Sequence, residues 1–276
     1  MVTIVEEAPA KINLALHVRH RRADGYHALE TLFAFAQDGD RITVAPAGRD
    51  GFAIGGRFSA GLAREGDNLV TRARDRFRAA VAPVPPVAIT LTKALPIASG
   101  IGGGSADAAA TLRALARLSG VPVKRVMPVA ASLGADVPAC VLGRTSRGTG
   151  RGDELEELDG LTDLPLLLVN PLVAVSTAAV FAGWDGVDRG GLALGNPMAV
   201  ALAGRNDLEP AARAVAPVID TVLATLAEQP GVRLTRMSGS GATCFALFDD
   251  VAGRDAADRA VAAARPDWWR MASRLA

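Results

Sequence analysis

The sequence predicts an α+β protein of two domains: a mixed or antiparallel sheet with helices first, then a smaller α+β domain. Three observations support this prediction. The first hundred residues contain apolar alternation typical of strands. Strands and helices then follow one another without a regular βαβ rhythm. A polar, glycine-rich stretch at 147–164 interrupts the chain, and we therefore place the domains at 1–155 and 156–276.

The first predicted domain opens with a strand at 11–19, where apolar residues alternate with Lys11, Asn13 and His17. This pattern is typical of a half-buried strand, with one apolar and one polar face. The other predicted elements are a turn at 22–25, a strand at 29–35, a turn at Asp38-Gly39, a strand at 42–45, a helix capped by Asp67 and ended by the prolines at 83–86, and a strand at 87–91.

The second predicted domain contains fewer strands. Its elements are a strand at 166–170, alanine-rich helical stretches at 197–204 and 211–228, a strand at 243–248 and a final helix near 254–264. The Trp268-Trp269 pair is compatible either with packing in this domain or with an interface.

Composition disfavours several classes of function. Thirty basic residues oppose 29 acidic ones, so the net charge of +1 provides no general attraction for nucleic acid or anionic lipid. The two cysteines lack the spacing of a disulfide framework or a zinc site. No apolar run approaches the roughly 20 residues of a membrane span. We therefore expect a cytoplasmic protein that binds neither nucleic acid nor membrane.

Lysine is rare in this chain, because all basic residues except Lys11, Lys93 and Lys124 are arginines. A compact ammonium group is not interchangeable with a guanidinium group. The remaining lysines therefore deserve scrutiny as functional residues.

A glycine-rich loop at 99–105 carries the strongest chemical signal. Four glycines within five positions reduce stability unless the backbone must approach another group closely. The loop follows the predicted strand at 87–91 and precedes a helix, for which we expect Ser105 as N-cap and Gly120 as terminator. Backbone N–H groups at such a helix start favour a phosphate, although a tight turn without a ligand is the alternative.

The two commonest nucleotide-binding motifs do not describe this loop. A P-loop requires a Gly-Lys pair, which the chain lacks, and the glycine spacing does not match the dinucleotide fingerprint. A serine hydrolase is also disfavoured, because the GxSxG motif is missing.

Two further segments are candidates for function. The loop at 237–242 alternates glycine with small hydroxyl residues before an apolar strand, which is also compatible with a simple hairpin turn. Asp136 is a lone carboxylate among apolar residues, just after a helix that ends at Gly134. On local grounds it is either an N-cap before Pro138 or a functional acid.

Three segments together resemble the GHMP small-molecule kinases: PAKINLAL near the start, LPIASGIGGGSADAAA in the middle and MSGSGAT near the end. Within that superfamily, PAKINLALHVRHRRADGYHALETLF, GADVP and the NDLE stretch at 206–209 are similar to the 4-diphosphocytidyl-2-C-methyl-D-erythritol kinases of the non-mevalonate isoprenoid pathway. The matching segments cover most of the chain in the same order, and jointly they are highly specific.

The resemblance implies a two-domain GHMP kinase fold that transfers the γ-phosphoryl group of ATP to the 2-hydroxyl of the methylerythritol unit, with Mg²⁺. Asp136 matches the family's catalytic aspartate, which accepts the hydroxyl proton, and Lys11 matches its lysine partner. The metal ligands stay unassigned. We expect a monomer or a weak homodimer.

The resemblance also implies the nucleotide site. The residues that match the phosphate-binding loop are Gly100, Gly102, Gly103, Gly104 and Ser105. Asn68 and Lys93 lie in segments similar to those near the nucleotide, although Lys93 is equally compatible with a solvated strand end.

For the cytidyl substrate, Tyr26 and His27 match the family's cytosine pocket, the first by stacking and the second by hydrogen bonding. Phe181 matches an aromatic on the other face of the cytosine. Each has a structural alternative: Tyr26 as the cap of a core, His27 as an exposed turn residue and Phe181 as a core residue.

Three further residues complete the predicted substrate site. Asn13 shares the Lys11 face of its strand and is expected to orient the hydroxyl or the aspartate, unless it is merely a polar residue on an exposed face. Gly239 and Ser240 match the family's third motif, which closes the site around the substrate.

Two positions depart from the family pattern, and neither is a predicted catalytic residue. Ser99 begins the glycine loop at a position where glycine or alanine is frequent, and Leu172 follows Pro171 where glycine is frequent. The rival interpretations are another GHMP kinase, of homoserine or mevalonate type, and a nucleotide-binding protein on the same fold without turnover.

Overall fold

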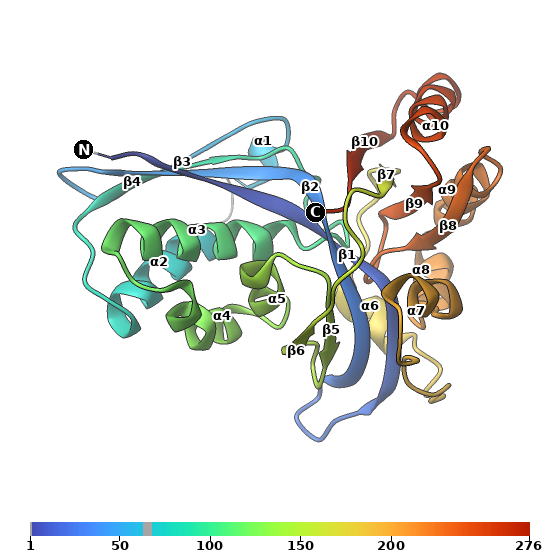
Figure 1. Cartoon of the computed structure of the whole chain (residues 1–276), viewed down its shortest axis with the longest axis horizontal. Helices are drawn as coiled ribbons and strands as arrows, with labels where there is room; N and C mark the ends of the chain where they lie inside the picture. Colours follow the sequence, from blue (N-terminus) through green and yellow to red (C-terminus); the bar gives the residue numbers. More distant parts are fainter. Residues whose placement is uncertain (1, 63–67) are drawn as a thin grey trace. The chain divides into compact units, whose positions relative to one another are not determined.

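The computed structural model describes residues 2–62 and 68–276 (Figure 1). The residues form two compact units, each discontinuous in sequence. The first unit contains Met1–Ala10, Asp38–Ile97 and Gly102–Gly143, and the second contains Lys11–Gln37, Ala98–Ile101 and Arg144–Ala276. The predicted α+β class is confirmed, whereas the domain boundary at 155 stays a prediction.

The first unit contains a mixed sheet, as predicted. Strands β1 (Ile4–Arg21) and β2 (His27–Pro46) pair with each other and are long enough to contribute to both units. In the first unit β2 pairs antiparallel with β4 (Val87–Thr92), and β3 (Gly51–Gly55) pairs parallel with β4. Burial alternates strictly along β4, as the sequence predicts.

The turn predicted at Asp38-Gly39 is wrong, because β2 continues through both residues. Gly39 has another physical reason to be glycine. A Cβ atom at this position would lie 2.0 Å from the carbonyl oxygen of Ala8, which belongs to β1. The glycine therefore permits the close approach of two backbones rather than a change of direction.

The helices of the first unit are α1 (Ser59–Leu62), α2 (Leu69–Ala80), α3 (Gly103–Ser119), the 3₁₀ helix η1 (Val123–Val126), α4 (Met127–Leu133) and α5 (Val137–Leu142). Helices α2, α3, α4 and α5 lie on one side of the strands of this unit (Figure 1). Helix α3 packs against α2 and α5, and α2 packs against α4. Asn68 caps α2 through a hydrogen bond from the Val70 N–H, whereas the predicted cap Asp67 lies outside the described residues.

The glycine-rich stretch at 147–164 is not a plain connecting segment. It contributes to a hairpin of β5 (Ser146–Thr149) and β6 (Glu154–Glu157), and β5 pairs with β2. Gly148 explains part of the composition, because a Cβ there would lie 2.8 Å from the Phe33 ring. The glycines of this stretch therefore permit close packing against β2 as well as turns.

The rest of the second unit is built on an antiparallel sheet in the order β10 (Trp269–Arg274), β7 (Pro165–Asn170), β9 (Cys244–Phe248) and β8 (Val232–Met237). Its helices are α6 (Thr177–Ala182), α7 (Pro197–Ala203), α8 (Glu209–Val215), α9 (Val218–Ala227) and α10 (Val251–Ala264). The single helical stretch predicted at 211–228 is two helices, since Pro217 lacks the N–H that would continue α8. Trp268 lies in the hydrophobic core of this unit.

No helix within residues 2–62 and 68–276 combines the length and the apolar character needed to cross a membrane.

Leu172 follows β7 in a backbone conformation that normally favours glycine, with a φ angle of 58°. Its N–H donates to Oδ1 of Asn170 at 2.6 Å, and Nδ2 of Asn170 donates to Thr243 Oγ1 at 2.8 Å. The loop therefore adopts a left-handed conformation at this position although the chain has leucine there. The leucine side chain is 44% exposed, so its packing offsets little of the backbone strain.

We expect the variant Leu172→Gly to raise the free energy of unfolding by up to about 1 kcal/mol, because glycine adopts positive φ without the Cβ clash. Leu172→Ala is the matched control, since it removes the side chain but keeps Cβ and should give no such gain. Urea denaturation of the three proteins measures both effects. Equal stability of the glycine and alanine variants would contradict the assignment of strain to Leu172.

Candidate active site

The glycine loop turns sharply through two left-handed residues before α3. Gly100 and Gly102 have φ angles of 78° and 64°, and α3 begins at Gly103 with Gly102 as its N-cap. The prediction that Ser105 caps the helix is wrong, because Ser105 lies inside the first turn. No side chain caps α3, so its first N–H groups are suited to an anion such as a phosphate. The predicted end of the helix at Gly120 is confirmed.

A buried ionic cluster lies beneath this helix start. Lys93 is 2% exposed, and its Nζ contacts carboxylate oxygens of both Asp40 and Asp107, the latter at 2.8 Å. The alternative of a solvated strand end is therefore wrong for Lys93. Its role toward the nucleotide stays a prediction, since the bonds found here serve to hold the two carboxylates.

The two carboxylates of the cluster differ in their surroundings. Asp40 also accepts hydrogen bonds from the Ala94 and Leu95 N–H groups at 2.6 and 2.8 Å. Oδ1 of Asp107 is buried and has no hydrogen-bond partner. Burial accordingly raises the pKa of Asp107 to about 7, against the opposing effect of Lys93. Burial by itself lowers the pKa of Lys93, but Asp107 and Asp40 together raise it, so the ammonium keeps its charge.

The lysine explains one glycine of the loop. A Cβ atom on Gly103 would lie 2.9 Å from Nζ of Lys93, closer than carbon and nitrogen can approach without displacement. A Cβ on Gly104 would meet only a side-chain carbon of Leu69, at 3.4 Å. The ammonium group therefore packs directly against the backbone of the loop at Gly103, but not at Gly104.

Asn68 and Asp136, also in the first unit, both lie at helix starts. Oδ1 of Asn68 is engaged in capping α2, and its contact with a nucleotide stays a prediction. Asp136 occupies the N-cap position of α5 after α4 ends at Gly134, but its side chain makes no capping hydrogen bond. The residue is half-buried and its side chain does not serve as a cap, and its role as a functional acid stays a prediction.

In the second unit, the polar face of β1 is buried, contrary to the prediction of a half-buried strand. Lys11, Asn13 and His17 are only 2% to 3% exposed. Nζ of Lys11 donates to Oδ1 of Asn13 at 2.8 Å and lies 5.3 Å from the centre of the Phe33 ring. Nδ2 of Asn13 donates to Thr31 Oγ1 at 2.8 Å. The alternative of Asn13 on an exposed face is therefore wrong. Lys11 and Asn13 form a buried, hydrogen-bonded pair of side chains.

The loop between β8 and β9 packs against this strand and against the start of the glycine loop. Ser238 Oγ accepts from the Asn13 N–H at 3.1 Å and donates to the Gly100 carbonyl at 3.0 Å. A Cβ on Gly239 would lie 2.8 Å from that same carbonyl oxygen. Ser240 Oγ lies 2.9 Å from Thr177 Oγ1. The loop is a hairpin connection, but its glycine also serves a close backbone contact.

Sequence reasoning overlooked Ser238, although it joins two predicted sites. Its position between Met237 and Gly239 is ordinary for a hairpin, and no local pattern distinguishes it from Ser240. Only the hydrogen bonds to β1 and to Gly100 reveal its role, since both partners are distant in sequence.

An aromatic cluster contains two of the predicted cytosine contacts. The His27 and Phe181 rings stack with centroids 4.9 Å apart and an interplanar angle of 29°, and the Trp184 ring meets His27 edge-on at 5.6 Å. Burial, with a contribution from Arg21, lowers the pKa of His27 below its usual value, which favours a neutral imidazole. A neutral ring both donates and accepts hydrogen bonds, as recognition of a pyrimidine requires.

Tyr26 has a different environment from the other aromatics. It is 56% exposed, which rules out the alternative that it caps a core. Arg151 from the hairpin of β5 and β6 lies over its ring, with the guanidinium carbon 5.3 Å from the ring centre. Arg151 was overlooked because its segment has the composition of a linker. The stacking of Tyr26 on a cytosine stays a prediction.

Comparison with known proteins gives the relationships of the chain. Residues 68–144 match the model described as "GHMP kinases N terminal domain", and residues 191–267 match "GHMP kinases C terminal". A protein of Rhizorhabdus wittichii named 4-diphosphocytidyl-2-C-methyl-D-erythritol kinase is 60% identical, over 98% of this chain and 94% of the relative. The chain belongs to the 4-diphosphocytidyl-2-C-methyl-D-erythritol kinase family of GHMP kinases.

Two further comparisons agree with this family. A protein of Sphingopyxis alaskensis with the same name is 50% identical over 99% of both chains. A crystal structure of 4-(cytidine 5'-diphospho)-2C-methyl-D-erythritol kinase has a TM-score of 0.83 and 33% identity over 99% of both chains. A homoserine kinase from Cytophaga hutchinsonii has a TM-score of 0.75 at 20% identity, covering 99% of this chain and 95% of that one, and so shows the shared fold alone.

Within this kinase, the predicted site residues separate by unit. Those expected to bind the nucleotide lie in the first unit, with the exception of Gly100, and Asp136 lies there too. Lys11 and all residues expected to bind the substrate lie in the second unit. The roles of the individual residues stay predictions.

The neighbouring glycines 103 and 104 provide a matched test of the ionic cluster. We expect Gly103→Ala to lower the free energy of unfolding by about 1–3 kcal/mol, because the methyl group must displace a buried, paired ammonium. Gly104→Ala should be neutral or raise stability by up to about 1 kcal/mol, since alanine favours a helix. Urea denaturation checks both, and a Gly103→Ala variant as stable as wild type would contradict the packing of Lys93 against the loop.

Proposed function

We propose that this kinase transfers the γ-phosphoryl group of ATP to the 2-hydroxyl of 4-diphosphocytidyl-2-C-methyl-D-erythritol, giving the 2-phosphate and ADP in the non-mevalonate isoprenoid pathway. The observation that carries the proposal is the 60% identity, over 98% of the chain, to a relative named for this substrate. We also infer a cytoplasmic location and a monomer or weak homodimer.

The aromatic cluster supports a cytidyl substrate. A cytosine is a flat ring with hydrogen-bond donors and acceptors at its edge, and the second unit offers the neutral His27, the Phe181 ring and the exposed face of Tyr26. A homoserine or mevalonate kinase would have no need for this set of residues. We therefore favour the cytidyl substrate over the other acceptors of GHMP kinases.

Phosphoryl transfer requires positioning and charge stabilisation more than covalent chemistry. The N–H groups at the start of α3 would hold phosphate oxygens. Asp136 accepts the proton of the attacking hydroxyl, and Lys11 offsets the negative charge that develops there. Asn13 fixes the position of the Lys11 ammonium through their 2.8 Å hydrogen bond.

The described residues fit a Mg²⁺ ion carried mainly by the nucleotide. Among them, no group of three or more His, Cys, Asp or Glu side chains could hold a metal ion. Mg²⁺ commonly retains waters and binds substrate phosphates with few protein ligands, so a dedicated cage is not required. When bound, the ion supplies neutralisation of phosphate charge.

The test is ADP release by the purified protein with Mg-ATP and 4-diphosphocytidyl-2-C-methyl-D-erythritol, beside homoserine and mevalonate. We expect turnover with the cytidyl substrate only, and a loss of about 10²- to 10⁴-fold in kcat for Asp136→Asn. Asp75→Asn is the control, because Asp75 is an exposed carboxylate on α2. Turnover with another acceptor would replace the substrate, and no turnover with any would favour a binding protein.

A further inference from the structure

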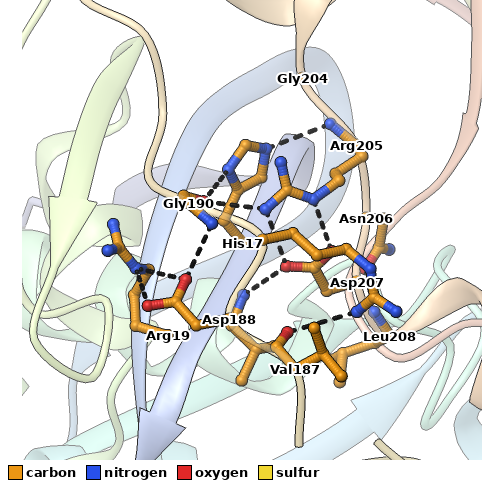
Figure 2. A network of polar contacts seen from close by, with 12 residues as sticks. His17, Arg19, Val187, Asp188, Gly190, Gly204, Arg205, Asn206, Asp207 and Leu208 are labelled. Atoms are coloured by element: carbon orange, nitrogen blue, oxygen red, sulfur yellow. Dashed lines mark hydrogen bonds and ion pairs between the residues drawn. The ribbon is translucent and has the colours of Figure 1, made fainter. Parts of the chain in front are cut away.

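His17 is a buried histidine on the same face of β1 as Lys11 and Asn13, and the proposed reaction leaves it unused. Figure 2 shows its ring between two chain segments. Nδ1 lies 3.0 Å from the Gly190 carbonyl oxygen, in a segment that we name the strap, residues 185–191. Nε2 lies 3.3 Å from the backbone nitrogen of Arg205.

These two contacts fix the protonation state of the ring. A carbonyl oxygen can only accept, so Nδ1 must carry the proton, and a backbone N–H can only donate, so Nε2 must accept. The imidazole is therefore neutral. An added proton on Nε2 would face the N–H of Arg205 and remove the hydrogen bond that joins β1 to that segment.

Two charged side chains act on the ring directly, Arg205 and Asp207, which pair with each other. The other charged groups of this region are paired among themselves: Arg19 with Glu30 and Asp188, Arg147 with Glu30, and Arg189 with Asp185. Burial and then Arg205 lower the pKa of His17 from 6.5, against smaller opposing effects of the Gly190 hydrogen bond and Asp207. The folded protein therefore favours the neutral ring, and this contribution to stability declines as the pH falls below 6.5.

The same network connects parts of the predicted substrate site. Arg205 donates from its side chain to Gly190 O at 2.8 Å and to Asp207 Oδ1 at 2.7 Å, and Asp207 Oδ2 accepts from the Val18 N–H at 2.8 Å. Asn206 donates to the carbonyl oxygens of Met237 and Gly239, both at 2.8 Å. The segment that contacts His17 therefore also holds the loop that carries Gly239 and Ser240.

The strap leads to the aromatic cluster by direct chain connection. It begins immediately after Trp184, whose ring meets His27, and shortly after Phe181 in α6. Its own anchors are Gly190 O and Asp188, which contacts Arg19. Loss of the His17 contact would leave Arg205 as the side-chain donor to Gly190 O and would loosen the C-terminal end of a segment that follows Phe181, a predicted cytosine contact.

We propose that His17 is a positioning residue whose neutral, Nδ1-protonated ring holds the strap and the segment 205–208 in place for binding of the cytidyl substrate. The inference rests on the proposed function, because it assigns the substrate whose affinity depends on this network. Nucleotide affinity should be independent of it, since no residue of the network is among those expected to bind the nucleotide.

The experiment measures KM for the cytidyl substrate and for ATP between pH 5 and 8 in wild type, His17→Asn and His20→Asn. The asparagine amide can replace Nδ1 as donor to Gly190 but cannot reach Arg205 as Nε2 does. His20 is an exposed histidine on the same strand and is the matched control. Thermal melting confirms that each variant is folded.

We expect the wild-type KM for the cytidyl substrate to rise as the pH falls below 6.5. The control His20→Asn keeps His17 and should show the same rise. In His17→Asn the KM for the cytidyl substrate should be about tenfold higher than in wild type at pH 8, because one hydrogen bond is lost. As the pH falls, this KM should lack the part of the rise that protonation of His17 causes. The KM for ATP should be the same in all three. Protonation of His27 contributes an acid limb in every variant, so an acid rise in His17→Asn as large as that of wild type would overturn the proposal, as would an equal rise in both KM values.

Two further measurements do not depend on turnover. They therefore test this inference even if the protein does not phosphorylate the cytidyl substrate. In ¹⁵N spectra of the three histidines, His17 should be a neutral ring protonated at Nδ1 that titrates below 6.5. At pH 7.5, trypsin should cut after Arg189 in the strap faster in His17→Asn than in wild type. A ring protonated at Nε2, or equal rates of cleavage, would overturn the proposal.

Discussion

A strand that is buried on both faces, and that carries lysine, asparagine and histidine on one of them, imposes the strictest constraint in this protein. Each polar group removed from water must find a partner, because an unpaired buried group costs several kcal/mol. Lys11 pairs with Asn13, Asn13 with Thr31, and His17 with two distant segments. Most of these partners are distant in sequence, so satisfying β1 determines much of the tertiary structure of the second unit.

Apolar periodicity predicted the strands and helices well wherever only one face is covered. Strand β4 and helix α2 match their predictions for this reason, since alternation and helical spacing report directly on burial. In β1 the same pattern was misleading. Polar residues normally indicate a solvent-exposed face, and the segments that contact Asn13 and His17 come from distant parts of the chain. No local pattern contains that information.

Glycine was the least reliable guide to local structure, because it serves two purposes that look alike in sequence. At Gly102 it provides a left-handed backbone conformation, as a turn requires. At Gly39 and Gly148 it gives space to a neighbouring strand or ring, so a turn and a linker were predicted where a strand and a hairpin exist. For the site, the family motifs located the glycine loop and Lys11, but Ser238 and Arg151 became visible only through contacts across the fold.

The scarcity of lysine, combined with the burial of two of the three, has a practical chemical consequence. Lys11 and Lys93 are 3% and 2% exposed and each holds a hydrogen-bonded ammonium, whereas Lys124 is exposed. Acylating reagents and cross-linkers attack the neutral amine at the surface, so among the lysine side chains they will react at Lys124. The α-amino group reacts with the same reagents, so a dye or a solid support will be attached at that group and at a single lysine side chain, with both buried lysines left intact.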